Sequence, residues 1–224
     1  MYPVRLPLKG KLHFKRCVIV SGFAVLLLAT LSVSSFAQTR YSVTDIGSLG
    51  GDVWPYAAIS NSGYVTGSSQ TSSGIFRAYI WDKTNGMVAV RTACSSATSF
   101  SFGLGVNSNG QVAGVCYDPH NVFQIAFRTD RSNNVSGFGP PSQSCGSFAR
   151  GINESGSVTG DLYYDCQLMR GHGFKWDGSF HELISLGGPF QDTGSYSAGF
   201  AINKDGVAAG FSTLPDATHQ SERS

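Results

Sequence analysis

The chain has 224 residues and a formal net charge of +2, with 41% hydrophobic and only 13% charged residues. Five of its 16 Lys and Arg residues and none of its 14 acidic residues precede residue 38, so the 187 residues that follow carry 11 basic and 14 acidic groups, a net charge of −3. This balance excludes a protein that binds nucleic acid through a basic surface, and the length allows a single domain with a sizeable core.

The first predicted element is a secretory signal peptide at residues 1–37. The basic stretch Met1–Arg16 precedes an apolar run, Val18–Val33, and the small-residue segment SSFAQ follows, with cleavage expected after Ala37. A helix that spans a membrane needs about 20 apolar residues, whereas this run has 16 and contains a serine and a glycine. We therefore expect an exported protein, either secreted, periplasmic or at the cell surface. The alternative is an uncleaved membrane anchor.

Residues 38–212 form the predicted β domain, and its first element is a short strand at residues 41–47. The segment YSVTDIGSLGG, residues 41–51, is similar to FHELISLGG, residues 180–188. The second segment stands at the end of the third copy of a repeat that the next paragraph describes. A chain that begins with the last strand of a unit can close a ring with its own N-terminus. We therefore expect residues 41–47 to complete the last unit.

A ten-residue pattern follows and occurs four times. Its copies end at glycines that are 47, 46 and 50 residues apart, and they read AISNSGYVTG (58–67), GVNSNGQVAG (105–114), GINESGSVTG (151–160) and AINKDGVAAG (201–210). Each copy predicts a β-hairpin, because Ser or Asn can open a turn by bonding the backbone and glycine accepts the positive φ at the turn exit. The glycines expected at that exit are Gly63, Gly110, Gly156 and Gly206.

A second pattern recurs in phase with the first in three of the four copies. Its segments FRAYIWD, FQIAFRTD and GHGFKWD alternate as strands do, and we expect their ends, Asp82, Asp130 and Asp177, to form turns rather than act as acids. The aromatic positions expected to point inward are Tyr79, Phe127 and Phe174. The small residues on the opposite face are Ala78, Ala126 and Gly173. A fourth short strand is predicted in MVAV, NVSGF and SFHELI.

These strands predict an all-β fold of four antiparallel sheet units of about 47 residues, arranged like the blades of a β-propeller, with the last unit incomplete. Such a unit cannot bury both faces of its sheet alone, so neighbours must stack. The expected units are residues 52–98, 99–145, 146–195 and 196–212, followed by a polar tail at residues 213–224. The fourth unit lacks the aromatic strand. Either it stays incomplete, or two chains complete each other, or the product is shortened relative to its relatives.

The motifs resemble the HAF-type extracellular repeat of bacterial exported proteins, which combines A-I-N-x-x-G-x-V-x-G, H-A-F-x-W and D-L-G-x-L-G-G. AINKDGVAAG and GINESGSVTG match the first motif, GHGFKWD with His172 the second, and TDIGSLGG and LISLGG the third. The resemblance covers most of residues 41–212. Arg77 and Ile125 replace the His in the first two copies, and the third motif is eroded after them. The resemblance implies export and a repeat-built β fold, and no shared catalytic activity.

Four cysteines follow the predicted signal peptide, and an even number suits an oxidising compartment. Three pairings are possible, and we favour Cys94–Cys116 and Cys145–Cys166 because each pair then lies within one repeat. Each bridge would stabilise the fold by about 3 kcal/mol through a loop of about 22 residues. Free thiols are the alternative. No spacing is typical of a zinc site, and we expect no metal and no cofactor.

The loops after the second predicted strands carry the most suggestive cluster of side chains. Its members are Tyr117, Asp118, His120, Tyr163, Tyr164 and Asp165. Tyr117 and Tyr163 both stand three residues after the recurring glycine, so we expect neighbouring units to present them side by side. Aromatic faces flanked by carboxylates suit a sugar-binding surface. The alternatives are that the tyrosines pack over the predicted disulfides, or that the Asp and His residues bind a metal ion.

No catalytic signature accompanies this cluster, because the sequence has no H-E-x-x-H, G-x-S-x-G, phosphate-binding or calcium-binding motif. We therefore expect an exported bacterial repeat protein that acts as a non-catalytic binding or interaction module for a polysaccharide or a surface protein. The alternatives are a propeller-type hydrolase with acids from several units and a structural, self-assembling surface protein. No nucleic-acid partner is expected, and a membrane is expected only if the N-terminal segment is uncleaved.

Overall fold

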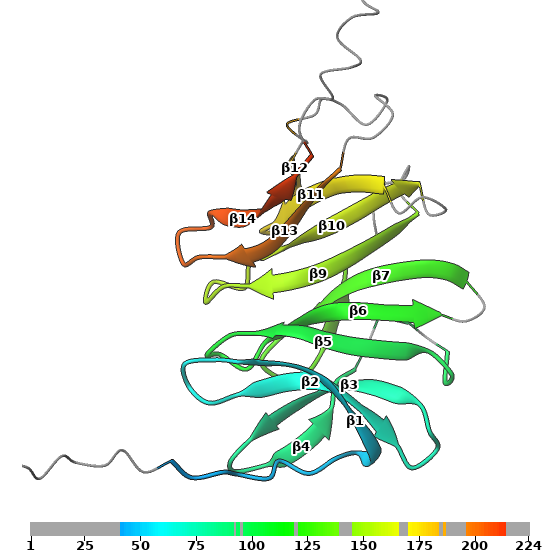
Figure 1. Cartoon of the computed structure of the whole chain (residues 1–224), viewed down its shortest axis with the longest axis vertical. Coiled ribbons are helices and arrows are strands. Elements are labelled where there is room, and N and C mark those ends of the chain that lie inside the picture. The colour runs from blue at the N-terminus through cyan, green and yellow to red at the C-terminus, as the bar shows by residue number, and fades with distance from the viewer. Residues whose placement is uncertain are drawn as a thin grey trace, which may run out of the picture. The chain divides into compact units, whose positions relative to one another are not determined.

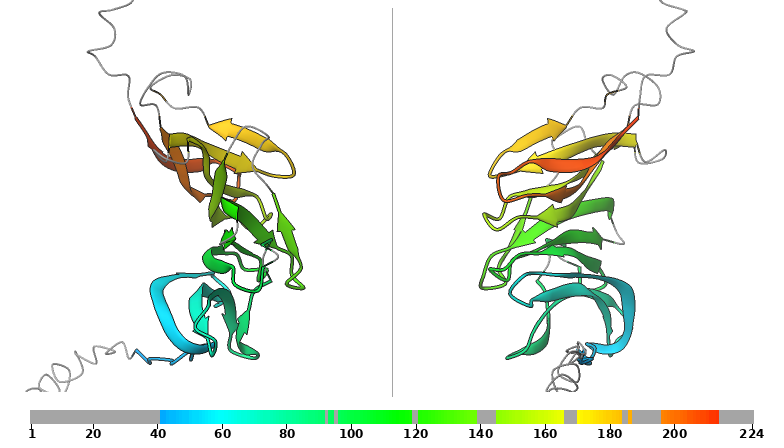
Figure 2. Two further views of the ribbon diagram at one scale, coloured as in Figure 1. Left: turned by 90° about the vertical axis from the view of Figure 1, so that its right-hand side faces the viewer. Right: turned by 60° about the vertical axis from the view of Figure 1, so that its left-hand side comes forward.

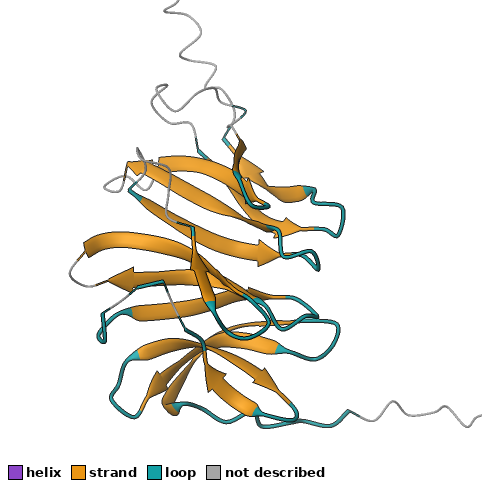
Figure 3. Cartoon of the chain, turned by 180° about the vertical axis from the view of Figure 1, so that it is seen from behind, coloured by secondary structure: helices purple, strands orange, loops and turns teal. Residues whose placement is uncertain are grey.

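The computed structural model describes residues 41–91, 93–94, 96–118, 121–138, 145–165, 170–183, 186 and 196–213. The chain divides into two parts, Met1–Thr44 and Asp45–Ser224, and every described strand lies in the second. The described residues form strands, turns and connections, with no helix among them, so the fold is all-β as expected (Figure 3). The described residues accordingly offer no helix of the length and apolarity that a membrane crossing requires.

The described strands fall into three groups of four and a final hairpin. The first group comprises β1 (Gly50–Ile59), β2 (Val65–Thr71), β3 (Phe76–Asp82) and β4 (Gly86–Ala89). The second comprises β5 (Phe100–Val106), β6 (Val112–Asp118), β7 (Asn121–Thr129) and β8 (Val135–Gly137). The third comprises β9 (Gly146–Ile152), β10 (Val158–Asp165), β11 (Arg170–Trp176) and β12 (Phe180–Leu183). The hairpin comprises β13 (Ser197–Ile202) and β14 (Ala208–Ser212).

Within each group the strands pair antiparallel in sequence order, and we call the groups sheet units one to four. A single parallel pairing, Gln124 in β7 with Gly146 in β9, joins units two and three into one eight-stranded sheet. The first strands β5, β9 and β13 each pack against the preceding unit, so the units follow one another as layers (Figure 1, Figure 2). Among the described strands, no pairing joins unit four back to unit one, so the ring expected of a propeller is not closed.

The four predicted hairpin turns share one geometry. The backbone N–H of the first turn residue donates to the carbonyl oxygen four residues on, over 2.9 to 3.1 Å, at Ser60, Asn107, Asn153 and Asn203. The side-chain oxygen of the same residue accepts the N–H four residues on, over 2.8 to 3.1 Å. The exit glycines have φ values of 85°, 74°, 82° and 79° at Gly63, Gly110, Gly156 and Gly206. The predicted need for glycine at the turn exit is therefore confirmed.

The third strands carry the core. The aromatic rings predicted to point inward, Tyr79, Phe127 and Phe174, are at most 1% exposed. The alanines on the opposite face, Ala78 and Ala126, are completely buried, because the next unit packs closely against them. One buried cluster includes Val106 and Phe127, and a second includes Ala149 and Phe174. Both predicted faces of these strands are thus confirmed as buried.

Serine side chains connect each unit to the one before it. The Ser101 hydroxyl on β5 accepts the backbone N–H of Ala78 on β3, over 2.9 Å. Two equivalent bonds of 2.9 Å run from Ala126 N–H to Ser147 and from Gly173 N–H to Ser197. Each bond satisfies a buried backbone donor of the third strand, which would otherwise be costly to desolvate.

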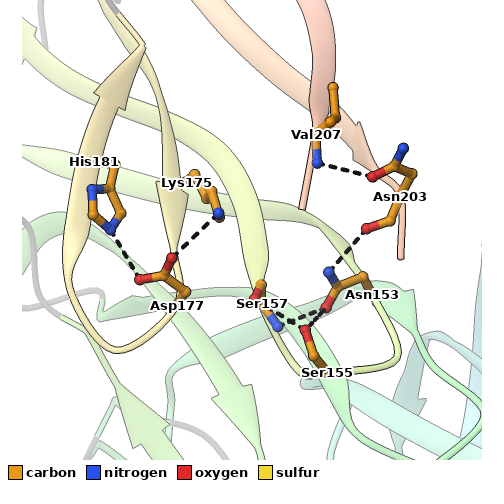
Figure 4. Close-up of polar contacts among 8 residues, drawn as sticks. All are labelled: Asn153, Ser155, Ser157, Lys175, Asp177, His181, Asn203 and Val207. Carbon is orange, nitrogen blue, oxygen red and sulfur yellow. Dashed lines mark hydrogen bonds and ion pairs between the residues drawn. The ribbon is translucent and has the colours of Figure 1, made fainter. Parts of the chain in front are cut away.

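Asparagine side chains make a second set of contacts between units, at the hairpin turns. The Asn107 side-chain nitrogen donates to the carbonyl oxygen of Asn153 over 2.9 Å. The Asn153 side-chain nitrogen donates in the same way to the carbonyl oxygen of Asn203, over 2.9 Å (Figure 4). Figure 4 also shows how the Asn153 side-chain oxygen holds its own turn through Ser155 and Ser157. Each asparagine therefore shapes one turn and fixes its spacing from the next.

The expected strand at residues 41–47 is absent, which corrects the predicted pairing of this segment with the last unit. Residues 41–48 carry no strand in the structure. The Asp45 side chain accepts the N–H of Gly47, whose φ of 72° bends the backbone away from an extended path. Leu49 N–H then donates to the Ser69 hydroxyl of unit one, and β1 begins at the next residue. This segment therefore leads into the first unit.

The predicted disulfide Cys94–Cys116 is present. Cys94 lies in the connection before β5 and Cys116 lies in β6, so the bridge ties that connection to unit two instead of lying within one predicted repeat. Cys145 is also disulfide-bonded, whereas Cys166 lies outside the described residues. A disulfide is compatible with an extracellular location.

Candidate functional site

The candidate site lies at the strand ends opposite the asparagine turns. In units two and three the first strand starts where the second strand ends, so that Phe100 pairs with Tyr117 and Gly146 with Tyr163. The connections between second and third strands, and those between units, leave from this same end. Loops that a rigid sheet holds in place often carry binding residues. Aromatic side chains are concentrated at this end of the sheets.

Nine aromatic rings form a continuous series of contacts across the four units, which we call the aromatic ladder. In order they are Trp54, Phe76, Phe102, Tyr117, Phe148, Tyr163, Tyr196, Phe211 and Phe200. The centroids of successive rings lie 5.1 to 6.5 Å apart. Edge and stacked pairs at such distances contribute about 0.5–1.5 kcal/mol each beyond their burial. The ladder therefore helps to hold the units in line.

The ladder is covered in the middle and open at both ends. Tyr163 is only 3% exposed, whereas Trp54 is 42%, Phe211 44% and Phe200 48% exposed. Large apolar rings with this much exposure offer flat faces to a ligand. The open rings of unit four lie next to the most strongly polar part of the ladder.

That polar part is the ion pair between Arg150 and Asp161. The Arg150 Nε atom lies 2.9 Å from both Asp161 carboxylate oxygens, and Nη2 lies 2.5 Å from Oδ2. The Tyr163 hydroxyl donates to the same Oδ2 over 3.0 Å. The Asp161 side chain is fully buried and that of Arg150 is 29% exposed. A bidentate pair of this kind is rigid, so the guanidinium presents its remaining N–H groups in a fixed direction.

Arg150 reaches this position because it is the extra residue of a β-bulge. Ala149 pairs with Gly160 and Gly151 pairs with Thr159, which leaves Arg150 without a partner across the strands. Bulges redirect a side chain and are common beside binding sites. The guanidinium carbon then lies 5.2 Å from the Phe148 ring centre and 5.1 Å from that of Phe200. Cation–π attraction on two sides keeps the arginine among the rings.

The protonation states at this site are fixed over the physiological pH range. Burial acts to lower the pKa of Arg150, but the hydrogen bonds and charge of Asp161 outweigh it and raise that pKa above its usual value. Burial, followed by the negative charge of Asp161, raises the pKa of Tyr163 well above its usual value. Burial also raises the pKa values of Tyr117 and Tyr196. The site therefore presents a permanent cation and neutral phenols.

The structure separates the predicted cluster into two places. Tyr117 and Tyr163 both belong to the ladder, but the Phe148 ring lies between theirs, at 6.0 and 5.7 Å. Tyr163 is nearly buried and offers its hydroxyl to Asp161 rather than an open face. The side chains of Asp118 and Asp165 are not among the described ones, and His120 lies outside the described residues.

Tyr164 points away from the ladder into a second polar cluster. Its hydroxyl donates to Glu182 Oε1 over 2.8 Å, and the same oxygen lies 2.6 Å from Nδ1 of the buried His172. Burial and then the hydrogen bond to Glu182 raise the pKa of Tyr164. His172, the one residue that matches the histidine of the second motif, thus joins β11 to β12. This arrangement is a structural contact within unit three.

The aspartates at the ends of the third strands behave as turn formers or surface ion-pair partners. Asp82 Oδ1 accepts the N–H groups of Thr84 and Asn85, over 2.8 and 2.9 Å. Asp130 Oδ1 accepts two turn N–H groups in the same way, from Ser132 and Asn134. Asp177 instead pairs with Lys175 and His181 at the surface, as Figure 4 shows. The interpretation of Asp82 and Asp130 as turn formers is confirmed.

Sequence reasoning missed most of the ladder. Phe102, Phe148 and Tyr196 lie near the starts of the first strands, in the segments FSFG, GSFAR and SYSAG. An aromatic residue next to the recurring serine is a signal that could have indicated them. Arg150 could not be recognised, because only the strand register reveals that it occupies a bulge.

A separate open pocket of about 760 Å³ lies between units one and two, next to Cys94 of the disulfide. Its lining includes Arg77, Arg91, Cys94 and Asn134. Arg77, which stands at the histidine position of the second motif, donates to the carbonyl oxygen of Ala97 over 2.6 Å. No aromatic ring lines this pocket, so it offers no stacking surface for a sugar. The ladder is therefore the better candidate for a carbohydrate site.

Within the described part of the chain, no three His, Cys, Asp or Glu side chains come together as ligands for a metal ion. No protein-family model matches the chain, and no curated protein is significantly similar to it. The resemblance to the HAF-type repeat therefore stays a prediction that depends on the quoted motifs.

Proposed function

We propose that the protein is an exported, non-catalytic binding module that holds a polysaccharide against the aromatic ladder beside Arg150. The observation that carries the proposal is the combination of exposed rings at Phe200 and Phe211 with a fixed guanidinium next to them. Sugar rings stack on flat aromatic faces through their C–H groups, and their hydroxyls need rigid hydrogen-bonding partners. Arg150 has N–H groups to donate after its contacts with Asp161 are made.

The proposal includes a repeat architecture of the β-propeller type, with the last unit incomplete. Three features support it: the recurring turn geometry, the three serine contacts and the asparagine contacts, each of which recurs from one unit to the next. In a stack of this kind, every unit buries its faces only against its neighbours. One strand end of all units then forms a continuous surface, which suits an extended polymer.

Export is supported by the composition of residues 1–37 and by the disulfide Cys94–Cys116. A basic start, an apolar run and a small-residue exit are typical of a secretory signal, and disulfides persist in oxidising compartments. An extracellular or surface location would also bring the protein into contact with polysaccharides. The HAF-type resemblance points in the same direction.

The test is isothermal titration calorimetry of the purified protein against a panel of soluble polysaccharides. Phe200→Ala and Phe211→Ala should each weaken binding by about 1–2 kcal/mol, because each removes an exposed stacking ring beside Arg150. The matched control is Tyr56→Ala, which removes an aromatic side chain that is 70% exposed and has no ring contact with the ladder. Equal loss of affinity in the control, or no binding of any glycan, would contradict the proposal.

Incubation of the protein with a glycan that it binds separates binding from hydrolysis. A hydrolase that cleaves glycosidic bonds usually needs two carboxyl groups on either side of the bond. In the described part of the ladder, Asp161 is the one carboxylate, and it is engaged by Arg150 and Tyr163. Release of reducing ends during prolonged incubation with a bound glycan would favour the hydrolase alternative instead.

A further inference from the structure

Among the described strands, two faces at opposite ends of the strand order have no neighbouring strand of the kind that buries the equivalent faces elsewhere. In units one to three, the residue just before the recurring glycine of the second strand packs against the following unit. These residues are Thr66, Ala113 and Thr159, and all three are completely buried. In unit four the equivalent residue, Ala209, is exposed. Val207, which directly precedes β14 and stands two residues before Ala209, is 64% exposed. We call Ala201, Val207 and Ala209 the outgoing face.

The complementary face belongs to β1. Ala57 pairs with Gly67 in the register in which Gly103 pairs with Gly114 and Ala149 with Gly160. Gly103 and Ala149 are buried against the preceding unit, whereas Ala57 is exposed. Pro55 is also exposed, and Ile59 is 73% exposed although its counterpart Val106 is 8% exposed. We call Pro55, Ala57 and Ile59 the incoming face.

The residues that face each other between units are matched in size. Gly103 lies so close to Thr66 that any Cβ would overlap the threonine hydroxyl, and Gly199 stands in the same relation to Thr159. Where the second strand carries the smaller Ala113, the facing position is Ala149 in the same buried cluster. By the same match, we expect an alanine to face Ala209 of the outgoing face. Ala57 of the incoming face is the residue at the matching position.

The asparagine contacts lead to the same pairing. Asn107 donates to Asn153 and Asn153 donates to Asn203, in each case to the turn carbonyl of the following unit. The next donor in this order is the side-chain nitrogen of Asn203, which is exposed (Figure 4). The equivalent acceptor at the other end is the carbonyl oxygen of Ser60, the first residue of the β1–β2 turn. A carbonyl oxygen has two lone pairs, so it can accept this bond as well as the one from Gly63.

The serine contact is missing on both sides of this pairing, which makes the two faces compatible. Ser101, Ser147 and Ser197 each accept an N–H from a third strand of the preceding unit. In β1 the residue at the serine position is Val53, which pairs with Ser69 as Ser101 pairs with Cys116, and its side chain cannot accept such a bond. Unit four has no third strand among the described residues, so no described N–H group is left without its serine.

We propose that the outgoing face of one chain binds the incoming face of a second copy of this chain, with β1 packed on the β13–β14 hairpin as β13 packs on unit three. The contact continues an interface that already recurs three times within the chain. It is heterologous, because two different surfaces meet, and such contacts generate a closed ring or a filament. The apolar side chains of Ile59 and Val207 would be buried in it, which supplies the driving force.

The test is sedimentation velocity of the purified protein over a range of concentrations, with the protein produced through export so that any N-terminal processing occurs. The wild type should form species larger than the monomer as concentration rises. Ala209→Arg on the outgoing face and Ala57→Arg on the incoming face should each remain monomeric. Both sites are exposed in the single chain, so both variants should fold, which circular dichroism checks. Val88→Arg, at a residue that is 43% exposed and on neither face, is the matched control and should assemble normally.

A mixture of the two variants gives the decisive result. Ala209→Arg keeps its incoming face and Ala57→Arg keeps its outgoing face, so together they should form a heterodimer and nothing larger. The proposal is overturned if the wild type is monomeric at every concentration or if the mixture stays monomeric. It is also overturned if Ala57→Arg assembles like the wild type, since the outgoing face would then bind itself or another protein. Neither variant alters the ladder beside Arg150, so loss of glycan binding and loss of assembly are separable.

Discussion

Arg150 and Asp161 occupy positions that hold apolar residues in the neighbouring units. In unit two the bulge residue is Leu104, and Val115, which pairs with Phe102 as Asp161 pairs with Phe148, stands at the position of Asp161. A buried ion pair is weak support for stability, because the desolvation of both charges offsets their attraction. Two apolar residues fit the same place in unit two, so the fold does not require the charges. The pair therefore supports the proposed binding role more than a role in stability.

Substitutions at this pair should therefore be strongly non-additive. Arg150→Leu leaves the buried carboxylate of Asp161 without its cation and should lower the free energy of unfolding by about 3–5 kcal/mol. Adding Asp161→Val recreates the Leu104–Val115 pair of unit two and should restore stability to within about 1 kcal/mol of the wild type. Urea unfolding of the wild type, both single variants and the double variant measures this. A double variant no more stable than Arg150→Leu would mean that the site depends on the charges.

Glycine at the turn exits has a different cause, the positive φ that it adopts. Gly110→Ala should destabilise the protein by about 1–2 kcal/mol, because alanine at a φ of 74° places its Cβ against the backbone and within 3.3 Å of the Tyr64 ring. Gly146→Ala is the control, since an added Cβ there meets nothing closer than 3.5 Å and the backbone is extended. Thermal unfolding compares the two. Equal melting temperatures would contradict the assignment of the turn.

At the scale of strands, the sequence allowed most elements to be predicted because each carries its own local signal. The hairpins follow from Asn or Ser and Gly at fixed spacing, and the third strands follow from alternation around Tyr79, Phe127 and Phe174. The strand expected at residues 41–47 is wrong, because the prediction depended only on the similarity of this segment to residues 180–188. A strand also needs a partner, which similarity alone does not supply.

The candidate site was less predictable, because its residues come together through contacts between strands and units. Tyr117 was found because it follows the recurring glycine at a fixed distance. Arg150 was not, since a β-bulge shifts its side chain relative to simple alternation, and alternation is what sequence reasoning uses. Phe148, which separates Tyr117 from Tyr163, belongs to a different strand from both. Contacts between units depend on how sheets pack, which the order of residues within one sheet does not specify.

The serine contacts between units provide a prediction at this scale. Ser147→Ala leaves the buried N–H of Ala126 without an acceptor and should cost about 1–3 kcal/mol of stability. Hydrogen exchange of the Ala126 amide should become faster relative to its neighbours. Ser62→Ala is the control, because the bond of Ser62 to the Ser108 carbonyl is exposed and its loss should cost less than about 0.5 kcal/mol. Equal effects of the two substitutions would show that the serine bond does not hold the units together.

At the scale of the whole second part of the chain, the core consists of interfaces between consecutive units. One buried cluster joins units one and two and includes the disulfide, and a second joins units two and three. Unit two contributes to both. Unit four adds Ala198 as its one described buried apolar side chain. In a fold whose units contact only their neighbours, stability is close to a sum over interfaces, so the units should differ in local stability.

Native-state hydrogen exchange should therefore show a gradient of protection along the chain. Amides of β6 and β7, which contribute to both buried clusters, should exchange only through global unfolding. Amides of β13 and β14 should exchange through local opening at a much smaller free energy, because unit four packs on one neighbour and β14 is largely exposed. Reducing the Cys94–Cys116 disulfide should speed exchange in units one and two and leave β13 and β14 unchanged, since their opening is already local. Uniform protection from β1 to β14 would mean that the units unfold as a single cooperative block. In that case the interfaces could not be treated as separate contributions to stability.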